Sequence, residues 1–387
     1  MNNTLKYPRL CLITFTLPEF EGGHIFVLSL LQLLEPLAEQ IITITGNYPE
    51  SAIFSPKIEL RNIKNDSKRQ SIVIRSGKYL GTQARICYEL IKTARKVDAV
   101  IFYVGGTALV LPMLAAKLLR KKTVLIAVGS TAESVEQTHK NSMFGVGSPI
   151  LTHLMKTLEM TNYALSDKIV VLSDSLVDSL GLGKYANKIN YNCATFIDTE
   201  RFAVRSRIQE RKNLVGYIGR LSEEKGVMNF VRAMPMVAKS CDVDFLIGGD
   251  GPMLNDIKAE VARHGLSNKV SFTKWIPHDR VPDYLDKLKL LVMPSYTEAF
   301  PGIALEAMAC GTPVLVAPVG AAPDIVQHGH NGFLLKDNSP QCIAQSIGEA
   351  LNYPKLANVA MNARNVVREK YSYDAILTGY ENVLCEL

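Results

Sequence analysis

Short apolar segments alternate with longer amphipathic segments along the whole chain, and this alternation is typical of parallel sheets covered by helices. In the first half, the apolar runs predict strands at residues 9–14, 41–45, 99–104, 123–128 and 168–172. The helical periodicity between them predicts helices at residues 24–39, 78–96, 107–120, 149–166 and 173–180. Residues 49–76 are polar and basic, and we expect them to be irregular.

The second half repeats this rhythm after a stretch without periodicity at residues 192–208. Its apolar runs predict strands at residues 213–219, 243–248, 270–272, 290–293 and 314–316. From residue 340 onward the pattern is helical and ends in a helix at residues 373–386. We therefore expect an α/β protein with two doubly wound domains, each binding ligands at the carboxyl ends of its strands.

One apolar run imitates a membrane span. Residues 99–116 contain no charged side chain, and a basic cluster follows them. However, Gly105, Gly106 and Pro112 interrupt the run, and its first part is rich in β-branched and aromatic residues. A buried strand, a turn and a helix that packs on the sheet explain the run better.

The composition describes a folded protein rather than a disordered one, with 47% hydrophobic and 21% charged residues among 387. The seven cysteines form no Cys-x-x-Cys pair and fall mostly within apolar runs. We expect buried free thiols in a reducing compartment, and neither a disulfide framework nor a zinc site. The apolar run after Arg9 is too short for a signal peptide, so we expect a cytoplasmic protein.

The positive charge is concentrated in the first half of the chain. Residues 1–195 carry 22 Lys and Arg against 15 Asp and Glu, whereas residues 196–387 carry 21 against 22. Residues 57–96 alone hold eleven bases and three acids. Two interpretations stay open: a solvated basic surface, or contact of the first domain with anionic lipid headgroups at the inner face of a membrane. No nucleic-acid module accompanies the charge, so we expect no nucleic-acid partner.

The stretch with the clearest chemical content lies between residues 294 and 335. Glu298 and Glu306 flank the turn Phe300-Pro301-Gly302, at which a helix is expected to begin. Two acids beside a helix N-terminus suit a sugar nucleotide, because the acids can bind sugar and ribose hydroxyls while the helix start favours phosphate. Dipole complementarity at a helix start explains one acid at most.

This stretch resembles the Glu-x7-Glu signature of glycosyltransferase family 4, whose members are retaining enzymes of the GT-B fold (glycosyl transferases group 1). The resemblance runs from about Asp198 to Leu335, with a weaker match at Gly22-Gly23. It implies two Rossmann-like domains facing a cleft. It assigns acceptor binding to residues 1–195 and donor binding to residues 196–368, and it implies that a helix at residues 369–387 packs back on the first domain.

The resemblance also implies the roles of individual residues. Arg220 and Lys225 would bind the donor diphosphate, Glu298 would lie at the donor sugar, and Glu306 would accept hydrogen bonds from the ribose. Arg220, Lys225 and Glu298 are the expected catalytic residues, because fixed cations stabilise a departing diphosphate. The remaining donor-binding residues are expected at Gly22, Gly23, Gly219, Lys274, Ile276, Phe300, Pro301, Gly302 and Ile303.

The chain departs from the family pattern in ways that affect substrate choice. No His follows the strand that ends at residue 128, where the family often carries one near the reacting sugar carbon. Lys274 replaces a family Gly in the region that recognises the base, so UDP and GDP both stay open. Asp242 and Asp244 form an Asp-x-Asp, but they begin a strand whose far end faces the site. We therefore expect no metal and no cofactor.

The sequence thus predicts a metal-independent, retaining transfer of a hexose-type sugar from a nucleotide-diphosphate sugar by front-face displacement. The acceptor stays open among polysaccharides, glycolipids, lipid-linked glycan precursors and small metabolites. Two alternatives remain. One is a nucleotide-sugar epimerase or a phosphorylase of the same fold, and the other is a non-catalytic protein that binds a membrane surface through its basic first half.

Overall fold

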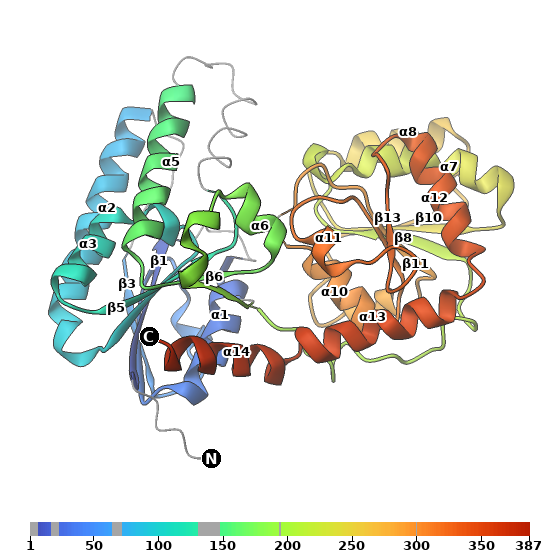
Figure 1. Cartoon of the computed structure of the whole chain (residues 1–387). Coiled ribbons are helices and arrows are strands. Elements are labelled where there is room, and N and C mark those ends of the chain that lie inside the picture. The colour runs from blue at the N-terminus through green and yellow to red at the C-terminus, as the bar shows by residue number, and fades with distance from the viewer. Residues whose placement is uncertain (1–6, 17–22, 64–71, 131–147, 193–194, 299) are drawn as a thin grey trace. The chain divides into compact units, whose positions relative to one another are not determined.

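The chain divides into two compact units, each built on a parallel sheet (Figure 1). The structure is a computed structural model that describes residues 7–16, 23–63, 72–130, 148–192, 195–298 and 300–387. Unit 1 comprises Met1–Phe196 and Ile376–Leu387, and unit 2 comprises Ile197–Ala375.

The sheet of unit 1 has the strand order β3-β2-β1-β4-β5-β6-β7, and all its described pairings are parallel. Its strands are β1 (Arg9–Thr16), β2 (Gln40–Gly46), β3 (Ile58–Asn62), β4 (Ala99–Tyr103), β5 (Lys122–Ala127), β6 (Lys168–Val171) and β7 (Ile189–Tyr191). Its helices are α1 (Gly23–Leu34), α2 (Ile72–Thr93), α3 (Val110–Leu118), α5 (Ser148–Leu165), α6 (Asp174–Ser179) and α14 (Tyr373–Cys385).

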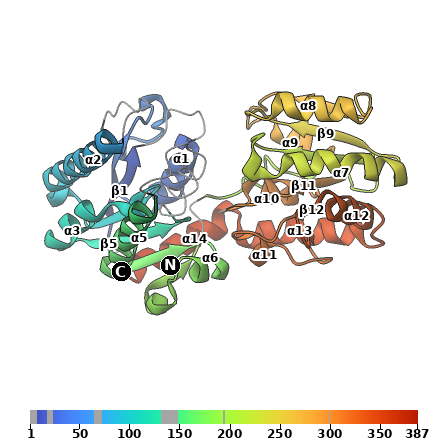
Figure 2. The same cartoon turned by 90° about the horizontal axis from the view of Figure 1, so that it is seen from above.

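Helices cover both faces of this sheet. Side chains from α2, α3, α5 and α6 share one buried cluster with alternate residues of the strands, such as Cys11 and Ile13 of β1. The views of Figures 1 and 2 place α1 and α14 on the opposite face. Hydrogen bonds join α14 and the residue after it to the rest of unit 1. Lys168 Nζ and Asn190 Nδ2 donate to Glu386 Oε2 at 2.6 and 3.0 Å, and Asn192 Nδ2 donates to the Ile376 carbonyl at 3.0 Å.

The sheet of unit 2 has the order β10-β9-β8-β11-β12-β13, also with parallel pairings. Its strands are β8 (Leu214–Ile218), β9 (Asp244–Gly248), β10 (Val270–Thr273), β11 (Leu290–Met293), β12 (Val314–Val316) and β13 (Phe333–Leu334). Its helices are α7 (Val227–Ser240), α8 (Leu254–Arg263), α9 (Val281–Leu285), α10 (Gly302–Ala309), α11 (Ala322–Ile325), α12 (Pro340–Leu351) and α13 (Leu356–Lys370).

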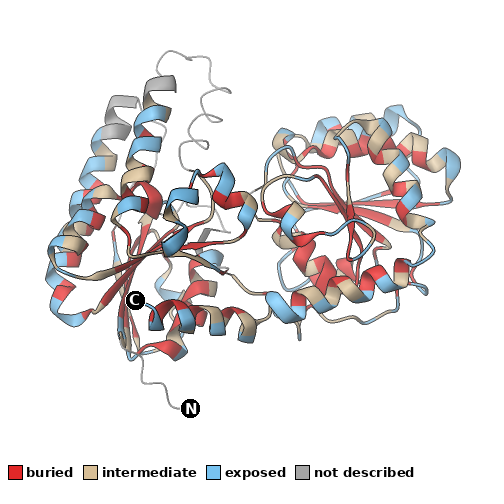
Figure 3. Ribbon diagram, in the orientation of Figure 1, coloured by how far each residue is buried: buried red, intermediate tan, exposed pale blue. Residues whose placement is uncertain are grey.

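Strand periodicity divides the core of unit 2 into two layers. Leu290 and Val292 of β11 face α7, α8 and α12, whereas Leu291 and Met293 face α9, α10, α11 and part of α13. Figure 3 shows the strands buried between helices whose outer sides are exposed. Strands buried on both faces become continuous apolar runs in the sequence, which is why their positions were predictable.

The predicted irregular segment at residues 49–76 is the main correction to the sequence analysis. It contains β3, a 3₁₀ turn at Glu50–Ala52 and the first residues of α2. β3 is the edge strand of its sheet, so its polar residues alternate with Ile58 and Leu60 instead of forming an apolar run. The short strands β7 and β13 were missed as well, and both lie at sheet edges.

Residues 99–116 form β4, a turn and α3, as the sequence predicted. The turn places Gly105 at φ 72°, where a Cβ would come 2.7 Å from the Phe15 Cβ. None of the helices in the described residues is both long and apolar enough to cross a membrane.

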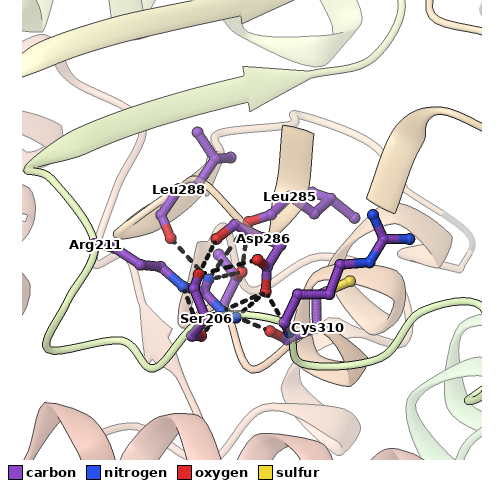
Figure 4. A network of polar contacts seen from close by, with 8 residues as sticks. Ser206, Arg211, Leu285, Asp286, Leu288 and Cys310 are labelled. Atoms are coloured by element: carbon purple, nitrogen blue, oxygen red, sulfur yellow. Dashed lines mark hydrogen bonds and ion pairs between the residues drawn. The ribbon is translucent and has the colours of Figure 1, made fainter. Parts of the chain in front are cut away.

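A buried arginine joins four segments of unit 2 (Figure 4). The Arg211 side chain is 1% exposed, and its guanidinium lies 3.1 Å from the Asp286 carboxylate. It also donates to the carbonyls of Ser206, Leu288 and Cys310 at 2.8–3.0 Å. Burial lowers the pKa of Arg211, and the charge of Asp286 opposes that shift.

We expect Arg211→Met to lower the free energy of unfolding by about 3–5 kcal/mol, because it leaves the Asp286 carboxylate and several carbonyls without their donor. Denaturant unfolding of the whole protein measures the loss. Arg207→Met is the matched control, since Arg207 is exposed in the same segment, and it should change stability by less than about 0.5 kcal/mol. Equal effects of the two variants would contradict a central role for the Arg211 network.

Candidate active site

The residues predicted to carry the chemistry follow β8 and β11, which are neighbours in the sheet of unit 2. In chain order the six strands of unit 2 are arranged 3-2-1-4-5-6, so the connections reverse direction between β8 and β11. Ligands of doubly wound sheets bind at the carboxyl ends of the strands on either side of this reversal. Arg220 and Lys225 lie beyond the end of β8, and Glu298 lies beyond the end of β11.

A glycine brings these two strand-end loops into contact. Gly226 has φ 65°, and a Cβ at this position would lie 1.9 Å from the Pro294 carbonyl oxygen. The Tyr296 amide donates to the Glu224 carbonyl at 2.9 Å, which links the same loops one turn away. Only a residue without a side chain allows this approach, so Gly226 sets the distance between the Lys225 loop and the Glu298 loop.

Lys225 and Glu298 form an ion pair across this junction. Lys225 Nζ lies 2.7 Å from Glu298 Oε2, and the two side chains are 24% and 16% exposed. The ammonium group has three N–H donors and the carboxylate has several acceptor positions, so both can bind further groups while paired. The pair therefore presents a cation and an acid side by side to a ligand above the strand ends.

Arg220 is the more accessible cation, since 65% of its side chain is exposed, and it pairs with Glu224. Burial raises the pKa of Glu224, but its hydrogen bond from Ser222 and the nearby Arg220 outweigh that effect and the pKa is lowered. Beneath them, the Tyr217 hydroxyl donates to the Arg220 carbonyl at 2.8 Å. Burial raises the pKa of Tyr217, and the charges of Glu298 and Glu224 add to the rise.

The glycine turn after β9 packs directly on the Arg220 segment. Gly249 has φ 125°, and a Cβ there would lie 2.0 Å from the Gly219 carbonyl oxygen. The Gly219 amide donates to the Gly248 carbonyl at 3.0 Å, and the Leu221 amide donates to the Asp250 carbonyl at 2.9 Å. The β9 turn thus supports the backbone that presents Arg220.

Helix α10 begins at Gly302, directly after Pro301. The Gly302 amide donates to the Phe300 carbonyl at 2.9 Å, so this amide is used within the turn. A Cβ at Gly302 would meet no atom within 4 Å, which leaves space beside the helix start. Ile303 follows in the first turn, and Phe300 packs against the ring of Tyr371.

Glu306 lies one turn further along α10, and its partner is a residue that the sequence analysis missed. His278 Nε2 lies 2.8 Å from Glu306 Oε1, and the two side chains are 46% and 15% exposed. His278 follows β10 and lies two residues beyond residues 272–276, the segment for which the family resemblance implies recognition of the base. That position is the one feature of the sequence that could have suggested His278 as a site residue, because a single His has no diagnostic spacing.

The structure brings some predicted residues together and leaves others apart. Ile276 is buried, with its Cδ1 2.9 Å from the position that a Cβ on Gly248 would take, whereas Lys274 is exposed. Gly22 lies outside the described residues, and Gly23 begins α1 in unit 1. The roles predicted for all these residues stay predictions.

The Asp-x-Asp lies at the opposite end of β9 from the glycine turn. Asp244 is the first residue of β9, and Asp242 pairs with Lys269 at 3.2 Å. In the part of the chain that the structure describes, no three His, Cys, Asp or Glu side chains are grouped so that they could hold a metal ion.

Comparison with known proteins agrees with this geometry. Residues 198–366 match the family model of glycosyl transferases group 1. The full chain aligns with the crystal structure of HepE from Anabaena in complex with UDP at a TM-score of 0.75 and 19% identity, covering 98% of this chain and 100% of HepE. The chain has the GT-B fold.

Three curated relatives carry glycosyltransferase names. An uncharacterized glycosyltransferase of Methanocaldococcus jannaschii is 32% identical over 177 residues, which are 46% of this chain and 45% of that protein. The 2-deoxystreptamine N-acetyl-D-glucosaminyltransferase of Niallia circulans is 25% identical over 74% of this chain and 75% of its own length. The 2-deoxystreptamine glucosyltransferase of Streptomyces kanamyceticus is 35% identical over 147 residues, which are 38% of this chain and 38% of that protein. The alignments with the Methanocaldococcus and Streptomyces proteins thus each span less than half of the relative's length.

We expect Gly226→Ala to be more destabilising than Gly265→Ala, although the two glycines have nearly equal φ of 65° and 67°. Both changes force a side chain into the left-handed region, at a cost of about 1–2 kcal/mol. Only Gly226 also drives its Cβ into the Pro294 carbonyl, which adds roughly 1–3 kcal/mol, because Gly265 has nothing within 4 Å. Thermal and denaturant unfolding measure the difference; equal losses would mean that the two loops tolerate separation.

Proposed function

We propose that this protein is a retaining glycosyltransferase of family 4 that transfers a hexose-type sugar from a nucleotide-diphosphate sugar. The observation that carries the proposal is the Lys225–Glu298 pair, held at 2.7 Å where the strand order reverses, with the exposed Arg220 beside it. The match of residues 198–366 to glycosyl transferases group 1 and the UDP bound by HepE support it.

Arg220 and Lys225 would bind the diphosphate. Negative charge builds up on the diphosphate as the sugar leaves, and fixed cations in place before the reaction stabilise that charge without reorganisation. The guanidinium can contact two phosphate oxygens, and the lysine acts as a point charge. Because these two cations supply the charge, the proposed reaction needs no metal ion and no cofactor.

Glu298 would accept hydrogen bonds from the donor sugar, and Glu306 would accept them from the ribose hydroxyls. The proposed transfer is a front-face displacement. The bond between the anomeric carbon and the phosphate oxygen breaks, and the acceptor oxygen bonds to the same face of the sugar. The departing phosphate oxygen takes the acceptor proton, so no protein nucleophile is required. The donor base is uracil or guanine, and the acceptor is a glycan or a lipid-linked glycan.

We expect the protein to release nucleotide slowly from one member of a panel of UDP-, GDP- and ADP-sugars in the presence of EDTA. Lys225→Met should lower this hydrolysis about 10²–10³-fold, because it removes a fixed donor to the leaving group. Glu306→Ala should weaken binding of the free nucleotide about tenfold or more, because hydrogen bonds to a charged acceptor are lost.

Two substitutions on the surface of unit 2, Glu369→Ala and Lys370→Met, are the matched controls, because both side chains are exposed. Each should hydrolyse the donor at the wild-type rate. Near-normal turnover in both Lys225→Met and Glu306→Ala would overturn the proposal. Conversion of the nucleotide sugar to an epimer without any acceptor would replace it with the epimerase.

We also propose that unit 1 contacts an anionic membrane surface, which would bring a lipid-linked acceptor to the enzyme. The support comes from the outer helical face, defined here as the exposed side chains of α2, α3 and α5. α3 packs against both α2 and α5, and the Leu111 amide at its start donates to Gln83 of α2 at 3.0 Å. Half of the fourteen exposed large hydrophobic side chains in the described residues lie on these helices: Leu80, Tyr88, Ile91, Leu111, Leu114, Leu118 and Leu154.

The charges around this face favour an anionic partner over a second copy of the chain. Exposed bases on α2, α5 and the segments that follow α2 and α3 are Arg85, Lys92, Arg95, Lys96, Arg120 and Lys156. Among the described residues of these three helices the acids are Glu89, which pairs with Lys92, and Glu159, which is 3% exposed. Two such basic faces would repel each other, whereas anionic headgroups attract them. The exposed leucines of this face can insert at the boundary between the lipid headgroups and the acyl chains.

We expect the full protein to co-sediment with vesicles of 70% phosphatidylcholine and 30% phosphatidylglycerol, but not with pure phosphatidylcholine, and to be released at 0.5 M salt. The double variant Ile91→Glu with Leu118→Glu should lose at least tenfold in partitioning, because it places two acids on the outer helical face. Met361→Glu is the control, since Met361 on α13 of unit 2 is 57% exposed, the same as Ile91.

Three results would overturn the membrane contact: no binding to anionic vesicles, equal loss in the Met361→Glu control, or a wild-type dimer that the double variant dissociates. Vesicle binding and donor hydrolysis are separate measurements, so either proposal can fail alone.

A further inference from the structure

The Glu306 carboxylate is held by a side chain from another element of unit 2. His278 Nε2 is 2.8 Å from Glu306 Oε1, and an ionised carboxylate can only accept, so the imidazole carries its proton on Nε2 and donates it. Among the described residues, this is the hydrogen bond of the Glu306 side chain, and none is found for its Oε2 oxygen.

The His278 ring is supported on one side by a buried aromatic side chain, although 46% of the His278 side chain is exposed. The ring packs against Phe202 with 5.5 Å between centroids, and Phe202 is 2% exposed. The segment around His278 is short and anchored at both ends. Ile276 is buried before it, and α9 begins at Val281 after it, where the Arg280 amide donates to the Pro277 carbonyl at 2.8 Å. A ring supported in this way can fix the carboxylate it contacts.

We propose that His278 is a positioning residue that determines the preference of the site for a ribonucleotide. It holds Glu306 through Oε1, so that Oε2 faces the ribose hydroxyls of the donor before the donor arrives. A free glutamate side chain loses rotamer freedom when it binds a ligand, and a carboxylate that is already held avoids much of that loss. The inference rests on the proposed function, because it takes Glu306 as the group that binds the ribose.

The alternative is that the His278–Glu306 bond only fastens the β10 loop to α10. The two interpretations differ in a measurable way. A fastening bond would affect all nucleotides equally when removed, whereas a positioning bond would affect only those that carry ribose hydroxyls.

The test compares binding of UDP with 2′,3′-dideoxy-UDP, and of GDP with 2′,3′-dideoxy-GDP, by calorimetry. Trp275 is the single tryptophan of the chain, lies three residues before His278 and is 62% exposed, so its fluorescence gives a second readout. We expect the wild-type protein to bind either UDP or GDP, and to bind that ribonucleotide about 100-fold more tightly than its dideoxy analogue. His278→Ala should reduce that preference about tenfold and leave the affinity for the dideoxy analogue unchanged. His278→Gln should recover part of the preference, because its amide can donate to Oε1.

Kinetics of donor hydrolysis give an independent check. His278→Ala should raise KM for the nucleotide sugar about tenfold while kcat stays within about twofold, because the hydroxyls are bound equally before and during the reaction. The matched control is His264→Ala, since His264 also lies near a glutamate, Glu260, at 3.5 Å in the same unit. It should leave both the preference and KM at wild-type values.

The outcomes separate this inference from the proposed function. If Glu306→Ala abolishes the ribose preference and His278→Ala keeps it, the positioning role is overturned and the function stands. If His278→Ala weakens ribo- and dideoxynucleotides equally, the bond is only a fastening and the inference is overturned. If Glu306→Ala keeps the full preference, the ribose role of Glu306 fails and the inference fails with it.

Discussion

The contact between Gly226 and the Pro294 carbonyl is the constraint on which the candidate active site depends. Lys225 and Glu298 are 73 residues apart in the chain, and they meet because the loops after two neighbouring strands touch through a position that has no side chain. A second close backbone contact of this kind lies on the other side of β8, where Gly249 in the turn after β9 lies against Gly219. The loops that follow β9, β8 and β11, which are neighbouring strands of the sheet, are therefore packed backbone against backbone. Such packing holds charged side chains in place more firmly than flexible loops could.

The architecture was predictable because it follows from burial on both faces of a parallel sheet. Strands such as β8 and β11 are uninterrupted apolar runs, and the helices between them show one apolar stripe each. Where that rule weakens, prediction failed. β3 lies at an edge, and only Ile58 of its five residues is buried, so its Glu59 and Arg61 made it look like part of a polar loop.

Within the candidate site, the sequence identified the candidate residues, whose roles stay predictions, but it did not predict how they are arranged. Arg220, Lys225, Glu298 and Glu306 were found from their residue types and spacing, and from the family resemblance. The pairing of Lys225 with Glu298, and of Glu306 with His278, depends on which strands are neighbours and on how far each loop extends. A single His in a loop has no periodicity, so the contact of His278 with Glu306 could be found only in the structure.

The position of α14 has a consequence for how the protein is synthesised. The chain leaves unit 1 after Phe196, builds all of unit 2, and returns to unit 1 at Ile376. Tyr380 and Val383 of α14 are buried, so unit 1 lacks part of its core until residues 376–387 have been made. The ribosome therefore starts unit 1 first but completes it last, whereas unit 2 has all its residues by Ala375 and can fold as a unit while the rest emerges. Unit 1 therefore stays incomplete, with apolar surface uncovered, while residues 197–375 of unit 2 are being made.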